Sequence, residues 1–223
     1  VSAYAAANKL VLGQIKTDAK SNEITAIPEL LALLDIKGCL VSIDAMGCQT
    51  EIAETILQQG GDYLLAVKGN QPKLFEAVRQ ALAPLAATPL CAETMTLEKA
   101  HGRIDGREYH VMAAGELAAQ FPHWKQLHSI GVAISYRVEN MQKITIEQRY
   151  FISSKALVQD EFARAVRGHW AIENSLHWVL DVTMGEDDCP IYRGDAAEIL
   201  ACIRHMGLNM LRAETSRKAS VRR

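Results

Sequence analysis

Apolar positions in the first part of the chain alternate between two spacings, one typical of strands and one typical of helices. Two short apolar runs, 1–6 and 10–16, flank a polar turn at Asn8 and predict an antiparallel hairpin. In the segment that follows, 24–34, apolar residues recur three and four positions apart. This spacing predicts a helix.

A strand, helix, strand, helix order comes next. The run 39–43 is short and partly β-branched and predicts a buried strand, and 63–67 predicts a second one. Between them, 49–59 has helical spacing and ends at a glycine pair, and a further helix is expected at 72–82. Since parallel neighbours need a crossover helix, this order predicts an α/β layer with a parallel pair.

The remaining sequence turns first to strands and then to helices. Alternation with a period of two predicts strands at 109–112, 130–136 and 144–152, the last two as a hairpin. Helical spacing returns from about residue 158 and predicts helices at 162–182 and 195–211. We therefore expect a mixed α/β protein.

Composition and charge fit an ordinary globular domain. Of 223 residues, 49% are apolar and 22% charged, and the net charge is −2, which excludes disordered and fibrous classes. No apolar run reaches the length of about 18 residues that spans a bilayer, so we expect no membrane partner. Nucleic-acid binding would have to depend on local charge clusters. Five scattered cysteines without metal-ligand spacing favour free thiols in a reducing cytoplasm.

Asp44 directly follows the first buried strand. Open α/β sheets bind ligands at the carboxyl ends of their strands, which makes Asp44 a candidate functional residue. Asp is also common just before helices, so a capping role for the helix at 49–59 is the alternative. Position alone leaves both interpretations open.

Four ionisable residues recur at every fourth position of the predicted helix at 162–182. His169, Glu173, His177 and Asp181 therefore follow one face with a drift of about 40° per step. They would form a solvated stripe of i,i+4 partners if that face were open to water. Tryptophan and aliphatic residues on both sides instead favour a partly buried face, where a carboxylate needs a partner or a metal.

Two carboxylates, Asp44 from a strand end and Glu173 from a distant helix, suit a divalent cation. Carboxylate oxygens are hard ligands that fit Mg²⁺ and can bridge two ions. The His-Glu-x-x-His pattern of zinc proteases is absent from the sequence, so zinc is disfavoured.

Four segments carry a resemblance to a known family. They are SIDAMGCQ at 42–49, GGDYLLAVKGNQ at 60–71, HGR at 101–103 and RGHWAIENSLHWVLDVTMGEDD at 167–188. Together they resemble bacterial insertion-sequence transposases, specifically the H-repeat-associated group of DDE transposases. The most specific pattern is HWxIENxLHWxLDV in the last segment, and the resemblance extends essentially from end to end.

The resemblance implies a ribonuclease-H-like fold, a mixed sheet with flanking helices. In this fold three acidic residues bind two Mg²⁺ ions, or Mn²⁺, and the enzyme cuts and joins DNA strands. Asp44 matches the second acid and Glu173 the third, so both would be catalytic metal ligands. The chain, 1–223, would be one catalytic domain with a β-rich insertion at about 85–152 and a helical part at about 158–212.

The same resemblance gives candidates for DNA contact after the second strand and on the late helix. Lys68, Asn70 and Gln71 supply an amine and two amides that could bind phosphate and sugar, and a polar loop is the alternative. His169 stands where wider DDE families have arginine, and His177 follows on the same face.

A local basic cluster precedes the first strand predicted in the β-rich part. His101, Arg103 and Arg107, together with Lys99, could follow a DNA backbone. A solvated turn is the alternative.

The first acid of the family, in an Asp-Gly-Lys motif on the central strand, has no counterpart in the sequence. We therefore expect an N-terminally truncated transposase domain that lacks this strand and is inactive by itself. One alternative is a non-catalytic remnant that retains DNA binding or self-association, and another is a metal hydrolase unrelated to DNA.

The expected partners follow from the resemblance. They are double-stranded DNA, both transposon ends and target, and a second copy of the chain in a homodimer on DNA. The expected location is the bacterial cytoplasm, with nucleoid association when the protein is bound to DNA.

Overall fold

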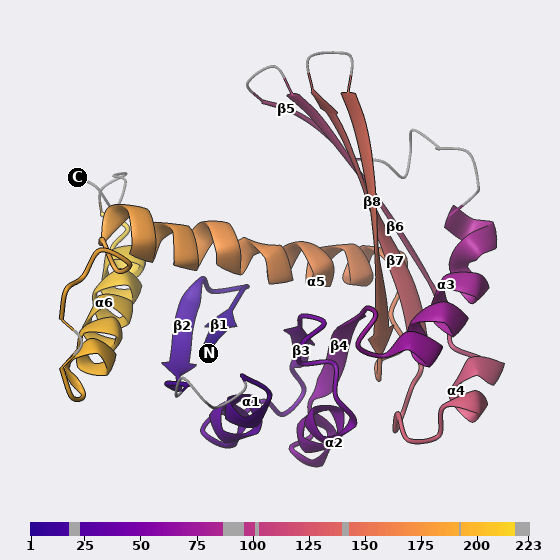
Figure 1. Cartoon of the computed structure of the whole chain (residues 1–223), viewed down its shortest axis with the longest axis horizontal. Helices are drawn as coiled ribbons and strands as arrows, with labels where there is room; N and C mark the ends of the chain where they lie inside the picture. The colour runs from indigo at the N-terminus through magenta and orange to yellow at the C-terminus, as the bar shows by residue number, and fades with distance from the viewer. Residues whose placement is uncertain (18–22, 87–95, 101–102, 140–142, 192, 217–223) are drawn as a thin grey trace. The chain divides into compact units, whose positions relative to one another are not determined.

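The computed structural model describes residues 1–17, 23–86, 96–100, 103–139, 143–191 and 193–216 (Figure 1). The chain divides into two compact units. The sheet unit comprises Ile36–Val166, and the terminal unit combines Val1–Asp35 with Arg167–Arg223.

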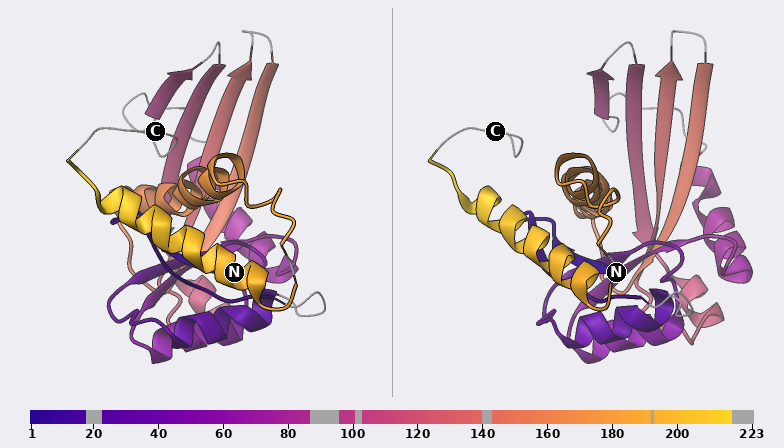
Figure 2. Two further views of the ribbon diagram at one scale, coloured as in Figure 1. Left: turned by 90° about the vertical axis from the view of Figure 1, so that its left-hand side faces the viewer. Right: turned by 60° about the vertical axis from the view of Figure 1, so that its left-hand side comes forward.

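A six-stranded mixed sheet forms the centre of the sheet unit (Figures 1 and 2). Its order is β3 (Leu40–Ile43), β4 (Asp62–Val67), β8 (Lys143–Ser153), β7 (Ser129–Glu139), β6 (Arg103–Ala113) and β5 (Thr96–Ala100). Strands β3 and β4 are parallel and joined by α2 (Thr50–Gln58), and the other neighbours are antiparallel. The predicted mixed sheet and its parallel pair are confirmed.

Helix α2 shows why the crossover follows the sequence pattern. Ile52 and Ile56 lie one turn apart, are almost completely buried, and belong to the helix face that contacts β4. After the helix, Gly60 adopts a φ of 76°, which glycine tolerates without strain. The other helices with residues in this unit are α3 (Pro72–Ala86), α4 (Glu116–Gln120) and the first part of α5 (Gln159–Ile172).

The start of α5 packs against the sheet through an aromatic cluster. Phe162 meets Phe151 and Tyr109 edge-on, with ring centroids 5.6 and 6.3 Å apart. Gly131 on β7 makes room for this ring, because a Cβ atom at that position would lie 2.6 Å from Phe162. The strand therefore requires glycine there.

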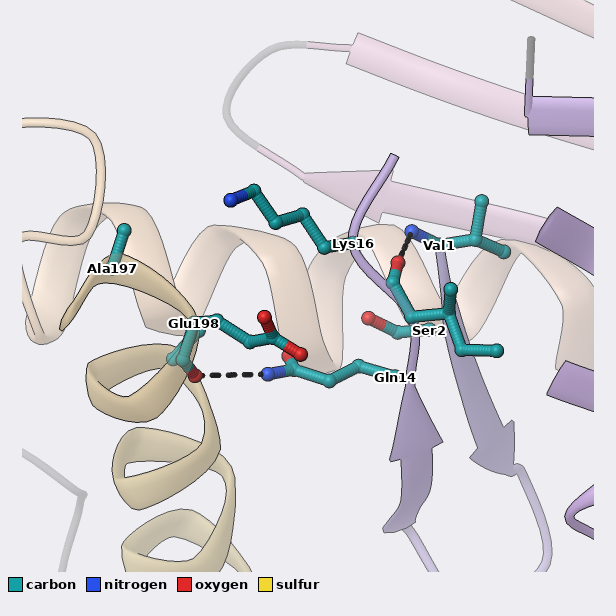
Figure 3. Close-up of a pocket in the computed structure, with 8 residues that line it drawn as sticks. Val1, Ser2, Gln14, Lys16, Ala197 and Glu198 are labelled. Carbon is teal, nitrogen blue, oxygen red and sulfur yellow. Dashed lines mark hydrogen bonds between the residues drawn. The ribbon is translucent and has the colours of Figure 1, made fainter. Parts of the chain in front are cut away.

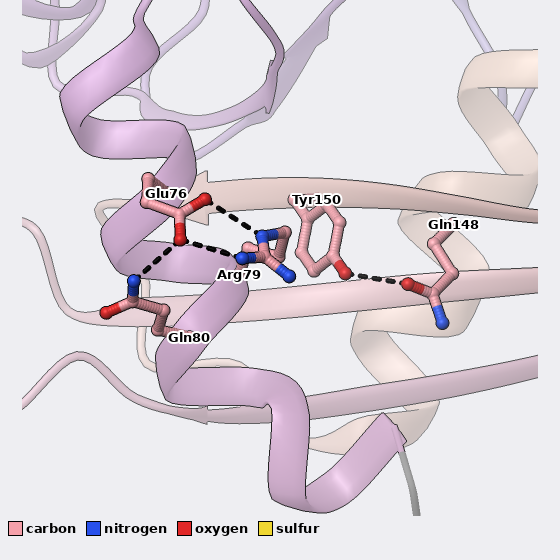
Figure 4. A network of polar contacts seen from close by, with 5 residues as sticks. All are labelled: Glu76, Arg79, Gln80, Gln148 and Tyr150. Atoms are coloured by element: carbon pink, nitrogen blue, oxygen red, sulfur yellow. Dashed lines mark hydrogen bonds and ion pairs between the residues drawn. The ribbon is translucent and has the colours of Figure 1, made fainter.

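Helix α3 contacts β7 and β8 and carries a polar network beside them (Figure 4). The Glu76 carboxylate accepts hydrogen bonds from Arg79 and Gln80, and Arg79 lowers the pKa of Glu76 most strongly, to about 2. On β8 the Tyr150 hydroxyl donates to the Gln148 amide oxygen at 2.8 Å. Glu76 and Arg79 are half-exposed, whereas Tyr150 is buried.

The terminal unit is built from both ends of the chain. Its elements are β1 (Ser2–Ala5), β2 (Leu10–Gln14), α1 (Glu23–Ala32), the end of α5, the π-helical segments η1 (Glu173–His177) and η2 (Val179–Thr183), and α6 (Ala196–Ala213). Strands β1 and β2 pair antiparallel, so the predicted hairpin is confirmed. Val11 on β2 packs with Leu176, Leu180 and Leu208, which joins the hairpin to the π-helical segments and α6.

Two polar side chains of α6 add directional bonds to this core. Asn209 accepts a hydrogen bond from the Val11 amide at 2.9 Å and donates to the Val11 carbonyl at 2.8 Å. Arg212 donates to the carbonyls of Lys9 and Ser175. The hairpin and η1 are therefore both bonded to the same helix.

The differences from the predicted elements are local. Strand β5 and helix α4, both short, were not predicted. The helix predicted at 162–182 is α-helical only to Ile172 and continues as η1 and η2. No helix in the described part of the chain is long and apolar enough to cross a membrane. The ribonuclease-H-like identity of the fold and its central strand stay predictions.

Candidate functional site

Asp44 lies in the loop that follows β3, with its side chain exposed. One carboxylate oxygen accepts a hydrogen bond from the Gly47 amide at 3.3 Å. This bond closes a local turn before α2, but the N-cap of that helix is Gln49 and no side chain caps it, so the capping alternative is wrong. The bond uses only one of the two carboxylate oxygens. Asp44 follows the carboxyl end of a parallel strand, a position where open α/β sheets bind ligands.

The loop after β4 binds the Asp44 loop directly. Asn70 donates from its side-chain amide to the Ala45 carbonyl at 2.6 Å, and Gln71 donates in the same way to the Cys48 carbonyl at 3.0 Å. Because β3 and β4 are parallel, their carboxyl ends bring both loops to the same sheet edge. The two amides therefore position the Asp44 loop, and Lys68 lies exposed beside them in sequence.

Cys48 belongs to this loop, and its thiol is not a nucleophile. Its side chain is completely buried, and burial raises the pKa of the thiol to about 12. The neighbouring Tyr63 is also buried, its pKa is raised by burial, and its hydroxyl donates to the Lys125 carbonyl at 3.0 Å. Both side chains are neutral structural supports at physiological pH.

Glu173 is the first residue of η1 and its side chain is exposed. The prediction of a partly buried face is confirmed for His169, His177 and Asp181, which are half-buried, but it is wrong for the Glu173 carboxylate itself. Leu176 and Leu180, on the other side of the segment, take the burial instead. The flanking Trp170 and Trp178 were the misleading signal, since both are substantially exposed.

The backbone around Glu173 is unusual. In η1 the Trp178 amide bonds to the Glu173 carbonyl, and in η2 the Met184 amide bonds to the Val179 carbonyl, five residues back in each case. Segments of π-helix are rare and occur frequently at functional sites. This geometry draws attention to Glu173 independently of the sequence motif.

A cluster of ionisable groups that the sequence did not indicate lies between η2 and α6. Arg204 approaches Glu186 at 3.6 Å. Burial raises the pKa of Glu186, and burial together with the charge of His177 lowers the pKa of His205. His177 therefore contributes to this cluster within the terminal unit, which is a structural alternative to DNA contact. The negative charge of Asp181 also contributes to the raised pKa of Glu186.

The basic cluster on the β-rich part is mixed with acids. His101 lies outside the described residues, and Arg103 is placed only as the first residue of β6. Arg107 pairs with Ser135, and two residues earlier on the same face of the sheet Asp105 pairs with Arg137. The Arg137 guanidinium contacts the Asp105 carboxylate at 3.2 Å. The surface is therefore only locally positive.

A cavity of about 220 Å³ lies in the terminal unit, between the hairpin and the start of α6 (Figure 3). It is lined by Val1, Ser2, Gln14, Lys16 and Glu198 among others, and Gln14 donates to the Glu198 carbonyl at 3.3 Å. The lining contains a single carboxylate. This cavity is therefore no candidate for a site with paired acids.

A metal site needs several His, Cys, Asp or Glu side chains close together. Among the residues that the structure describes, no group of three or more His, Cys, Asp or Glu side chains is placed to hold an ion. Asp44 belongs to the sheet unit and Glu173 to the terminal unit. Their carboxylate chemistry fits Mg²⁺, and a metal site shared by the two stays a prediction.

Comparison with known proteins places the chain in a family. The family model of the transposase DDE domain matches residues 1–210. Over its full length the chain is 48% identical to "H repeat-associated putative transposase YhhI" and 48% identical to the protein YbfL, both of Escherichia coli K12, and it spans 60% of the length of each. The chain belongs to the transposase DDE domain family.

Proposed function

We propose that this chain forms a catalytic domain for DNA transposition, in which Asp44 and Glu173 hold divalent metal where DNA strands are cleaved and transferred. The family match over residues 1–210 carries the proposal. Two further observations support it: Asp44 stands at the carboxyl end of a parallel strand, and Glu173 begins a π-helical segment with its carboxylate exposed. The name of YhhI supports the same class of activity.

Mg²⁺, with Mn²⁺ as its substitute, is the cation that fits these donors. Bound there, it would neutralise phosphate charge and activate the attacking oxygen. The chain's own contribution is positioning. Asn70 and Gln71 fix the loop of Asp44 through the carbonyls of Ala45 and Cys48. Lys68 is available for a phosphate oxygen at the same edge.

The proposal includes a ribonuclease-H-like fold. Strand β3 is an edge of the six-stranded sheet, and β1 and β2 form a separate two-stranded sheet. A strand that carries the family's first acid would pair beside β3. With two acids instead of three, we expect the 223-residue chain alone to bind DNA and metal without cleaving strands. Two copies would act as a homodimer on DNA, in the bacterial cytoplasm and on the nucleoid.

A second function is a non-catalytic role in DNA binding or self-association. The observation in its favour is that the sequence matches the second and third acids of the family, Asp44 and Glu173, but not the first. The two proposals differ in whether Asp44 and Glu173 bind one metal ion.

Localised cleavage of the protein backbone by Fe²⁺ tests the shared metal site. Fe²⁺ bound in place of Mg²⁺ produces hydroxyl radicals with ascorbate and peroxide, and these cut the chain near the ion. We expect fragments that end near Asp44 and near Glu173, and the loss of both sets in either Asp44→Asn or Glu173→Gln. Asp160→Asn, an exposed acid at the start of α5, is the matched control and should leave both sets unchanged.

Fragments at only one of the two positions would overturn the shared site. Unaltered duplex-DNA binding together with the absence of both sets would favour the non-catalytic role. Metal-dependent DNA cleavage that is lost in Glu173→Gln would confirm the catalytic role and disprove the expectation that two acids are insufficient.

DNA binding by the β-rich part has its own test. We expect the combined change Arg103→Ala and Arg107→Ala to weaken duplex binding and to flatten its dependence on salt, because fewer phosphates are neutralised. Arg164→Ala, an exposed arginine of α5, is the control. Identical salt dependence in the double variant and the wild type would show that these two arginines of β6 do not contact the DNA backbone.

A further inference from the structure

Helix α6 has an outer seam that the terminal unit does not use. The seam consists of Ala196, Ile199, Ile203, Met206, Met210 and Ala213. Its four large side chains are 57%, 56%, 61% and 73% exposed in chain order. The opposite side of the helix is the one that packs, through the buried His205 and Leu208. A helix buried on one side and apolar on the other has a second face to cover.

The spacing along the seam is that of a coiled coil. Successive members are three, four, three, four and three residues apart, which is the alternation of a and d positions in heptads. This series reads the same in both directions. Two copies of α6 packed antiparallel would therefore place Ile199 against Met210 and Ile203 against Met206, with Ala196 against Ala213 at both ends. Large residues face large ones and small residues face small ones.

Residues beside the seam permit this pairing. Cys202, Gly207 and Asn209 flank its middle and carry no charge, so two copies would meet without repulsion there. Exposed charges stand at the ends, with Arg193 and the N-cap Asp195 before the helix and Glu214 after it. Antiparallel packing brings Arg193 of each copy near Glu214 of the other, whereas parallel packing would bring like charges together.

We propose that α6 is a self-association surface on which a second copy of this chain docks antiparallel through the outer seam. The inference deepens the proposed homodimer on DNA and rests on it for its biological role. A contact made by one helix from each copy is at the small end of the range for specific interfaces, so the dimer is weak in free solution. Binding of two copies to neighbouring DNA ends would raise their effective concentration and complete it.

Analytical ultracentrifugation of the full 223-residue chain, without DNA or metal, tests the surface. From about 1 to about 200 μM protein, we expect the wild type to pass from monomer to dimer. The double change Ile203→Lys and Met206→Lys should raise the dimer dissociation constant at least about 100-fold, because it buries four charges in the seam. Leu211→Lys, an exposed leucine of the same helix that lies off the seam, is the matched control and should dimerise normally.

A charge exchange tests the direction of packing. We expect Arg193→Glu to weaken the dimer about three- to tenfold, and addition of Glu214→Arg to restore it, because the antiparallel dimer contains two such exposed pairs. A wild type that stays monomeric, a Leu211→Lys variant as impaired as the seam variant, or a double charge variant that is not restored would overturn the proposal. Asp44→Asn and Glu173→Gln should dimerise like the wild type, so failure here is distinguishable from failure of the metal site.

Discussion

The Asp44 loop and the Glu173 segment each hold a carboxylate at the surface, but by opposite means. Asp44 depends on directional bonds, because the amides of Asn70 and Gln71 bind the carbonyls of its loop. Glu173 depends on burial, because Leu176 on the far side of η1 is completely enclosed. The loop is thus held by bonds between two turns, and the π-helical segment by an apolar core.

This difference predicts how the two regions respond to change. A buried leucine contributes several times more to stability than one hydrogen bond near the surface. Damage to the core of the terminal unit should therefore unfold it, whereas damage to the bonds of the Asp44 loop should release the loop and leave the sheet intact.

The largest effect is expected from Leu176→Ala. Removal of this side chain leaves a cavity among Val11, Leu180 and Leu208, and should lower the free energy of unfolding by about 2–5 kcal/mol. Urea denaturation followed by circular dichroism measures it. Val182→Ala, on the half-exposed side of η2, is the control and should cost under about 0.5 kcal/mol. Equal losses in the two variants would show that η1 is not held by burial.

Asn209→Ala sharpens the comparison, because it breaks a polar clamp inside the apolar region. The Val11 amide and carbonyl would both lose their side-chain partner, which should cost about 1–3 kcal/mol in the same denaturation experiment. Gln14→Ala removes an exposed hydrogen bond to Glu198 and serves as the control. If both changes have the same small effect, the clamp does not stabilise the hairpin.

The reactivity of the Cys48 thiol measures whether the Asp44 loop is held in place. The wild-type thiol is buried and its pKa is about 12, so at about pH 8 it should resist alkylation while the exposed Cys39 and Cys202 react. Asn70→Ala combined with Gln71→Ala should expose Cys48 to reagent at a cost to global stability of only about 1 kcal/mol. Mass spectrometry of the alkylated sites measures this.

The control for this change is Gln49→Ala, which removes an exposed bond to Met46 within the Asp44 loop itself. Protection of Cys48 should persist there. Protection that persists in the double variant as well would mean that the loop after β4 does not hold the loop after β3.

The sequence predicted those helices and strands whose apolar residues recur with a regular spacing. Apolar spacing located α2 and the hairpins, and the order of strand and helix predicted the parallel pair of β3 and β4. Strand β5 escaped because it is five residues long and largely polar, so no alternation stands out in TLEKA. Helix α4 is equally short.

The contacts of the candidate site were harder to predict. Asp44 and Asn70 were both singled out, but the bond from Asn70 to Ala45 crosses 25 positions and depends on the register of two strands. Exposure of Glu173 was misjudged because apolar neighbours in sequence do not show which of them face the core. The pair of Glu186 and Arg204 joins a loop to the middle of α6, and no local pattern indicates such a contact.

The smallest predicted effect concerns pH and the packed side of α6. Burial lowers the pKa of His205 in the folded chain, so the unfolded chain binds more protons once the pH falls below about 6.5. Stability that is present above that pH should therefore decline as the solution is acidified.

Glu186 has the opposite effect on stability, because its pKa is raised in the folded chain and acidification therefore favours the folded state. Stability measured from about pH 7.5 to about 5.5 in a Glu186→Gln background should fall, and adding His205→Asn should flatten the slope. An unchanged slope would show that His205 does not cause the pH dependence of the terminal unit.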